Sequence, residues 1–188
     1  MKTRSHSQLP LPPEFAAFQG RCAKAALHRP DMPTDLILLS RLSGYIAMRM
    51  EEAFDRLLEP WGLNSWSWLA LMMSHWCGED AFTPTAVSRT LFLPRANVTR
   101  VTDELVRRGL LHREPSVRDR RVLELSLTEA GRALVEEILP HAWATHRAIW
   151  SEVPPDRLED ARNLLTSIAK GIDSLTVGTA TVPPKEQA

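Results

Sequence analysis

Cysteine is scarce in this chain of 188 residues, in which only Cys22 and Cys77 carry a thiol. Two cysteines do not make the disulfide framework of a small secreted domain. Apolar runs are short as well, and none approaches the roughly 18–20 residues that span a bilayer. The N-terminal segment has basic residues without a continuous apolar stretch behind them, so it lacks the pattern of a secretory signal. These absences predict a cytoplasmic protein that has no membrane partner.

Sequence patterns for catalysis and metal binding are absent too. The chain has no Gly-rich phosphate loop, no GxSxG sequence and no pair of catalytic carboxylates in a recognised motif. His141 and His146 are five residues apart, so on a helix they face different sides and are poor joint ligands for a metal. We therefore expect neither an enzyme nor a metalloprotein, and no cofactor.

Net charge does not indicate a partner either, because 23 Lys and Arg residues balance 23 Asp and Glu residues. The distribution of the charge is uneven, however. Between Arg89 and Arg121 there are nine arginines and four acidic residues, an excess of five positive charges. A basic concentration of this kind is typical of a surface that contacts nucleic acid.

The basic stretch begins with the pattern of a helix-turn-helix. Thr83 suits an N-cap and Pro84 a first helical position, since proline lacks the N–H that would be unpaired there. A turn at Phe92-Leu93 separates this short helix from a second one, which runs from Pro94 to Arg108. One side of the second helix is apolar, and Gly109 follows it as a C′ residue with positive φ. The apolar side consists of Val98, Val101, Leu105 and Val106.

Beyond Gly109 the hydrophobic period changes from helical to alternating. Two strands of a β-hairpin are predicted at Leu110–Glu114 and Val122–Leu127, the second with Leu123, Leu125 and Leu127 in alternation. The connection, Pro115–Arg121, is polar and basic. A helix in the major groove beside a basic tip on phosphates or in the minor groove suits duplex DNA.

Together these residues resemble the MarR family of bacterial transcriptional regulators. The matching segments are NVTRVTDELVRRGLL, the DRR of the hairpin tip and LSLTEAGR, which opens the next helix. This hairpin tip is called the wing. The family has the pattern Asp-x-Arg in the wing, and this pattern matches Asp119 and Arg121. The resemblance implies a winged helix-turn-helix that binds double-stranded DNA, and a homodimer in which the terminal helices of two subunits interlock.

DNA contacts are expected from the helix-turn-helix and from the wing. Asp119 lies beside three arginines, so we expect it to pair with one of them, such as Arg121, and to shape the wing. The remaining candidates combine side chains suited to base edges with side chains suited to phosphates. The candidates are Thr83, Thr85, Arg95, Ala96, Asn97, Thr99, Arg100, Arg118, Arg120 and Arg121.

The expected fold class is mainly α with a small β-hairpin wing. An N-terminal extension, residues 1–33, contains a short helix at Glu14–Leu27, which is either part of a mobile tail or an arm that packs on a partner subunit. A winged-helix domain follows over residues 34–175, and its DNA-binding lobe covers about residues 65–127. A disordered tail is expected for residues 176–188.

Dimerisation helices are expected at about residues 34–58 and 128–175. Thr34 or Asp35 would cap the first, and Thr128 would cap the helix after the wing. Pro140 must kink or divide that helix, because it removes a backbone hydrogen bond. The last helix, Asp156–Leu175, has an apolar stripe that suits either a dimer interface or the core of a monomer.

Aromatic and methionine residues crowd the helix that Asn64 or Ser65 caps, and most of them are expected in the core. A sharper interpretation is a pocket for a small aromatic acid in the crevice where the family binds such ligands. Arg49 lies on an apolar stripe, and its guanidinium snorkels to water, pairs with Glu51 or Glu52, or anchors a carboxylate ligand. The candidate ligand residues are Tyr45, Arg49, Trp68, Met72 and His75.

The sequence therefore predicts a repressor that binds a pseudo-palindromic operator as a homodimer and is released by a small aromatic acid. Alternatives are an activator or architectural DNA-binding protein without a ligand, and a redox-sensing repressor that uses Cys22. Some family members sense oxidants through a cysteine near the start of the first long helix. Cys22 lies about a dozen residues before that point, which favours an inert thiol.

Overall fold

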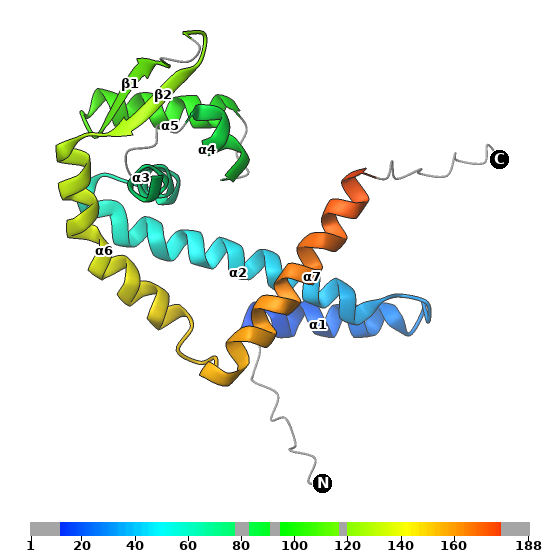
Figure 1. Ribbon diagram of the computed structural model, residues 1–188. Coiled ribbons are helices and arrows are strands. Elements are labelled where there is room, and N and C mark those ends of the chain that lie inside the picture. Colours follow the sequence, from blue (N-terminus) through cyan, green and yellow to red (C-terminus); the bar gives the residue numbers. More distant parts are fainter. Residues whose placement is uncertain (1–11, 78–82, 91–94, 117–119, 178–188) are drawn as a thin grey trace. The chain divides into compact units, whose positions relative to one another are not determined.

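The computed structural model describes residues 12–77, 83–90, 95–116 and 120–177. The chain forms two compact units, residues 1–142 and 143–188, and each is described by itself. Within the described residues the fold is mainly helical, with one two-stranded antiparallel sheet (Figure 1), as the sequence predicts. In chain order the elements are α1 Pro13–Ala26, α2 Thr34–Leu58, the 3-10 helix η1 Glu59–Trp61, α3 Ser65–Cys77, α4 Pro84–Thr90, α5 Arg95–Arg107, β1 Leu111–Pro115, β2 Leu123–Leu127, α6 Glu129–Ile149, the 3-10 helix η2 Pro155–Arg157 and α7 Leu158–Val177.

The two helices of the helix-turn-helix have the termini that the sequence predicts. Thr83 caps α4, because its Oγ1 accepts the Ala86 N–H at 3.1 Å. Gly109 follows α5 with φ of 68°. Leu110 N–H donates to the Leu105 carbonyl and Gly109 N–H to that of Val106, both at 2.9 Å, which is a Schellman motif. The predicted turn at Phe92-Leu93 and Pro94 lie outside the described residues.

The core of the first unit lies where α3, α5 and the hairpin meet (Figure 1). Val98, Val101 and Leu105 of α5 are buried, as the helical period predicts, and Val106 is half-buried. Leu71 of α3 and Leu125 of β2 are fully buried. The apolar side of α5 is therefore held in the core, and its opposite side is left to solvent.

The hairpin forms with strand bounds within one residue of those predicted. Leu111 pairs with Leu127, Arg113 with Leu125 and Pro115 with Leu123. The expected alternation is only partly right, because Leu123 is 42% exposed. Leu123 lies at the tip end of the hairpin opposite Pro115, whereas Leu125 is buried beside the helices.

Three other local predictions have different outcomes. Asn64 caps α3, since its Oδ1 accepts the Ser67 N–H at 2.9 Å. The predicted side-chain cap of α2 is wrong, because Thr34 is its first residue and the Thr34 hydroxyl donates to the Met32 carbonyl instead. Trp76 is not a core residue, since it lies near the end of α3 and is 74% exposed.

α6 begins as predicted, with the Thr128 Oγ1 accepting the Gly131 N–H at 2.9 Å and Glu129 in the first turn. Pro140 does not divide it, and one helix continues to Ile149. Pro140 is exposed, so water can hydrate the carbonyl that the missing N–H leaves unpaired.

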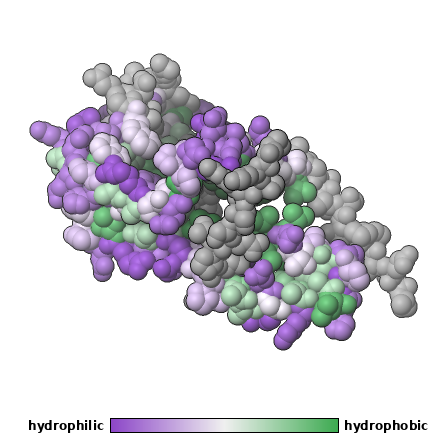
Figure 2. Space-filling model, turned by 90° about the horizontal axis from the view of Figure 1, so that it is seen from below, coloured by the Kyte–Doolittle hydropathy of each residue, from purple (hydrophilic) through white to green (hydrophobic). Residues whose placement is uncertain are grey.

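In the second unit the apolar stripe of α7 is exposed. Leu164 is 61%, Ile168 41% and Ile172 57% exposed, so the stripe is not buried against other residues of this unit. Hydrophobic side chains are visible among hydrophilic ones on the face of the molecule drawn in Figure 2. Residues 178–188, most of the expected disordered tail, lie outside the described residues.

Candidate nucleic-acid interface

The outer side of α5 carries several predicted DNA-contacting residues together. Ala96, Asn97, Thr99 and Arg100 are all exposed on this helix. The same helix buries Val98 and Val101, so the packing of its apolar side determines which residues face outward. Arg95 begins α5, but its side chain lies outside the described part of the structure. Thr83 and Thr85 are half-buried at the start of α4, where Thr83 is engaged as the cap.

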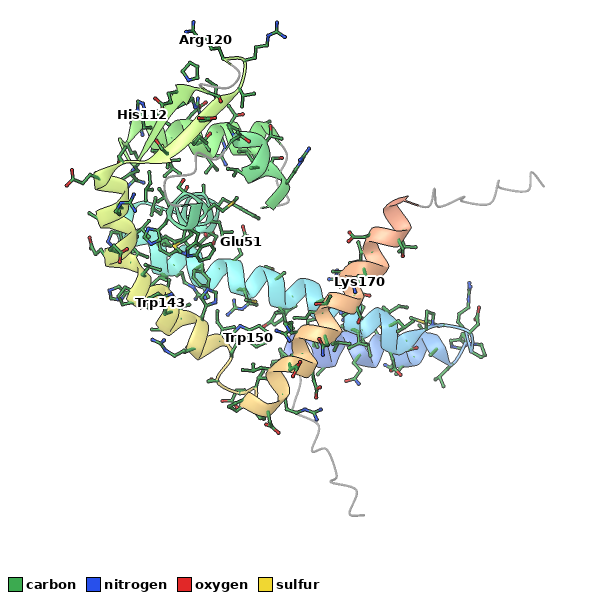
Figure 3. All side chains as sticks on the ribbon, viewed as in Figure 1. Glu51, His112, Arg120, Trp143, Trp150 and Lys170 are labelled. Atoms are coloured by element: carbon green, nitrogen blue, oxygen red, sulfur yellow. The ribbon has the colours of Figure 1, made fainter. Side chains whose placement is uncertain are left out.

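The wing places basic side chains at the end of the hairpin. Arg120 and Arg121 are both exposed, and Arg120 extends outward from the tip (Figure 3). Arg118 and Asp119 lie outside the described residues, so the predicted pairing within the wing stays a prediction. An exposed guanidinium on a hairpin tip is suited to phosphate oxygens.

Several arginines of the basic stretch are occupied by partners within the chain. Arg107 hydrogen-bonds Glu104 at 2.6 and 3.0 Å, and this hydrogen bond lowers the pKa of the Glu104 carboxyl, so the pair is charged at neutral pH. Arg113 of β1 pairs with Asp103 at 2.5 Å and donates to the Thr102 hydroxyl. Fewer than nine arginines of this stretch therefore contribute positive charge that no acidic side chain neutralises.

Among the described side chains of the stretch, Arg89, Arg100 and Arg120 are exposed without an acidic partner.

Arg108 holds the end of α5 against the corner between α2 and α3. Its two terminal nitrogens donate to the carbonyls of Trp61 and Gly62, each at 2.7 Å. Trp61 in turn donates its indole N–H to Glu137 of α6 at 2.8 Å, and its ring lies 5.7 Å from that of His141. Through this corner, α5 is tied to α6 by charge-assisted and side-chain hydrogen bonds. Nothing in the sequence singles out Arg108 or Trp61, because their partners are distant along the chain.

Arg108→Met is expected to lower the free energy of unfolding by about 1–2 kcal/mol, because it removes two hydrogen bonds from a charged donor. Urea denaturation measures the change. The matched control is Arg107→Met, which loses only a solvent-accessible surface pair with Glu104 and should leave the stability unchanged. Equal effects of the two substitutions would contradict the structural role of Arg108.

The five candidate ligand residues are not gathered around one described cavity. Trp68 and Met72 are buried in the core at 5% and 4% exposure. Arg49 pairs with Glu52, the alternative that the sequence left open. His75 Nε2 lies 3.4 Å from Glu136 of α6. Tyr45 contacts Phe15 of α1, and it alone of the five lines one of the described cavities.

The described residues contain one buried thiol and no candidate metal cluster. Cys22 is buried in α1 at 5% exposure, and the side chain of Cys77 lies outside the description. No cluster of three or more His, Cys, Asp or Glu residues that could hold a metal occurs among them. None of the helices described has the length and apolar character needed to cross a membrane.

Comparison with known proteins agrees with this geometry. Residues 61–122 match the model of the MarR family. Transcriptional repressor MprA of Escherichia coli strain K12 is 29% identical over 152 residues, which cover 81% of this chain and 86% of MprA. PecS of Dickeya dadantii, an HTH-type transcriptional regulator, is 24% identical over 76% of this chain and 86% of its own.

Solved structures show the same fold. A mutant MarR from Escherichia coli in complex with operator DNA has a TM-score of 0.66 and 22% identity, over 73% of this chain and 98% of that one. BpsR of Bordetella bronchiseptica, whose DNA binding is regulated by 6-hydroxynicotinic acid, has a TM-score of 0.63 and 25% identity. The match covers 69% of this chain and 91% of the BpsR chain. Residues 61–122 therefore match the MarR family, and the chain as a whole is similar to winged helix-turn-helix transcriptional regulators of that family.

Proposed function

We propose that this protein binds operator DNA in a sequence-specific manner and regulates transcription in the cytoplasm. The observation that carries the proposal is that Asn97, Thr99 and Arg100 are exposed on α5, which contacts strand β1 of the wing, and that the wing carries exposed Arg120. Helix α5 enters the major groove and the wing contacts phosphates or the minor groove. The operator complex of the related MarR supports this assignment.

The functional form that we propose is a homodimer on a pseudo-palindromic operator. Support comes from the apolar stripe of α7, because a row of large exposed apolar side chains marks an interaction surface. Two copies of α5 then reach successive major grooves about 34–36 Å apart. A two-fold operator follows from the two-fold symmetry of such a dimer.

We further propose repression that a small aromatic acid relieves. The repressor MprA and the ligand-regulated BpsR, which are similar to this chain, support both parts of the proposal. A ligand releases DNA only if it binds more tightly to the form that misfits the operator. An operator that overlaps the core promoter indicates repression, whereas one upstream of it indicates activation.

The direct test is a titration of the protein against the DNA immediately upstream of its own gene, with random DNA as competitor, at two salt concentrations. We expect tight binding that resists the competitor and weakens with salt, because arginine–phosphate contacts release counterions. Binding no tighter than that to random DNA would contradict sequence-specific recognition of this operator. A promoter-fused reporter then measures whether binding lowers or raises transcription.

Arg120→Ala is expected to reduce the slope of log affinity against log salt by about one unit, since one phosphate contact is lost. The loss should be similar for operator and random DNA, because phosphates carry no sequence information. Arg157→Ala, in η2 outside the proposed interface, is the control and should leave the slope unchanged. An unchanged slope for Arg120→Ala would remove this residue from the contact surface.

A further inference from the structure

A cleft of about 530 Å³ separates α1 from α2, two helices that lie side by side in Figure 1. Phe15 and Phe18 of α1 line it together with Tyr45 of α2. The Phe15 and Tyr45 rings pack edge to face, with centroids 5.2 Å apart and planes at 68°. Because Phe15 is only 7% exposed, this aromatic wall is already fixed before any molecule enters.

Two guanidinium groups border the same cleft. Arg21 extends from α1 and Arg41 from α2, and the Arg41 guanidinium lies 5.8 Å above the Phe18 ring. Among the side chains that the structure describes, no carboxylate pairs with either arginine. Arg49, two turns further along α2, contrasts with them because Glu52 neutralises it. The cleft therefore combines aromatic surface with positive charge that has no acidic partner in the described residues.

Gly44 keeps space open in the wall of the cleft. A Cβ built on Gly44 would meet no heavy atom within 4 Å, so glycine is not required there by a close approach of the backbone. Instead, Gly44 lines the cleft together with Tyr45 and Met48 and contributes no side-chain volume to it. A side chain added at this position therefore begins in open space within the lining of the cleft.

We propose that this cleft binds a planar aromatic carboxylate, with the ring against Phe18 and Tyr45 and the carboxylate held by Arg21 and Arg41. Guanidinium groups match carboxylate geometry, and aromatic walls favour a flat ring. The proposal rests on the proposed ligand response and moves its site from Arg49 and His75 to the α1–α2 pair. α1 lies outside residues 61–122, which match the family model, so the cleft is built in part from the N-terminal extension.

The test measures binding of 2-naphthoate to the full-length protein without DNA, by isothermal titration calorimetry. We expect one saturable site per chain and at least tenfold weaker binding of 2-naphthamide, which has the same shape without the charge. No binding up to about 1 mM, or equal affinity for the neutral amide, would overturn the proposal.

Two variants locate the site. Arg41→Met and Gly44→Leu are each expected to weaken 2-naphthoate binding at least tenfold, the first by removing a cation and the second by filling the cleft. Their controls are Arg56→Met on α2 and Gly20→Leu on α1, where an added Cβ also meets no atom within 4 Å. Neither control residue lines the cleft, and binding should be unchanged in both.

Loss of binding in Arg49→Met with full binding in Arg41→Met would place the ligand elsewhere and overturn the proposal. If a second copy of the chain fills the cleft in a dimer, the protein will bind no naphthoate and Gly44→Leu will change the oligomeric state. That result would also overturn the proposal. Because the measurement contains no DNA, its failure leaves DNA recognition standing. Failure of operator binding likewise leaves the naphthoate result intact.

Discussion

Gly131→Ala is expected to lower the free energy of unfolding by about 3 kcal/mol, because overpacking against a rigid backbone cannot be relieved by a side-chain rotation. A Cβ at Gly131 would lie 2.1 Å from the Leu110 carbonyl oxygen and 3.0 Å from Leu127 Cδ1. The same Leu110 carbonyl accepts the N–H of Thr128 at 3.2 Å and its hydroxyl at 3.1 Å. The start of α6 therefore cannot move away without losing its connection to the end of the helix-turn-helix.

Thermal and urea denaturation of the purified protein measure this change. Gly20→Ala is the matched control, since the added methyl group meets no atom within 4 Å and α1 gains a better helix former. We expect that control to leave the stability equal or raise it by less than about 1 kcal/mol. A Gly131→Ala protein as stable as the control would show that α6 can shift away from Leu110.

Leu164→Asp combined with Ile172→Asp is expected to convert the proposed homodimer to a monomer and to weaken operator binding by about a hundredfold or more. Both side chains are more than half exposed in the single chain, so the charges destroy an interface rather than a core. A monomer binds one half-site at a time. It loses the high effective concentration at which a dimer presents its second copy of α5 to the other half-site. Analytical ultracentrifugation and the operator titration measure the two effects.

The control for this experiment adds the same two charges to the opposite side of α7. Asn163→Asp with Ser174→Asp should preserve both the dimer and the operator affinity, because these positions are exposed and lie away from the apolar stripe. If the stripe variant stayed dimeric, α7 would not form the dimer interface. If it became a monomer with unchanged operator affinity, the two-fold operator model would be wrong.

The sequence by itself determined the local elements around the proposed interface. The caps Thr83, Asn64 and Thr128, the C′ residue Gly109 and the hairpin strands are all as predicted or within one residue. Such features depend on hydrogen bonds between residues a few positions apart and on the side-chain period of each element. The cap of α2 was the exception, because the turn at Met32 uses the Thr34 hydroxyl instead.

Only the tertiary structure decided which charged and aromatic residues remain available. Arg108 and Arg100 look alike in the sequence, but Arg108 is bound to carbonyls 46 and 47 residues away and Arg100 is exposed. Arg41 meets Phe18 only because α1 folds against α2, and Gly131 is required only because Leu110 approaches it. Contacts between residues far apart in the chain depend on how the helices pack. Neither the hydrophobic periodicity of a segment nor its number of charged residues contains that information.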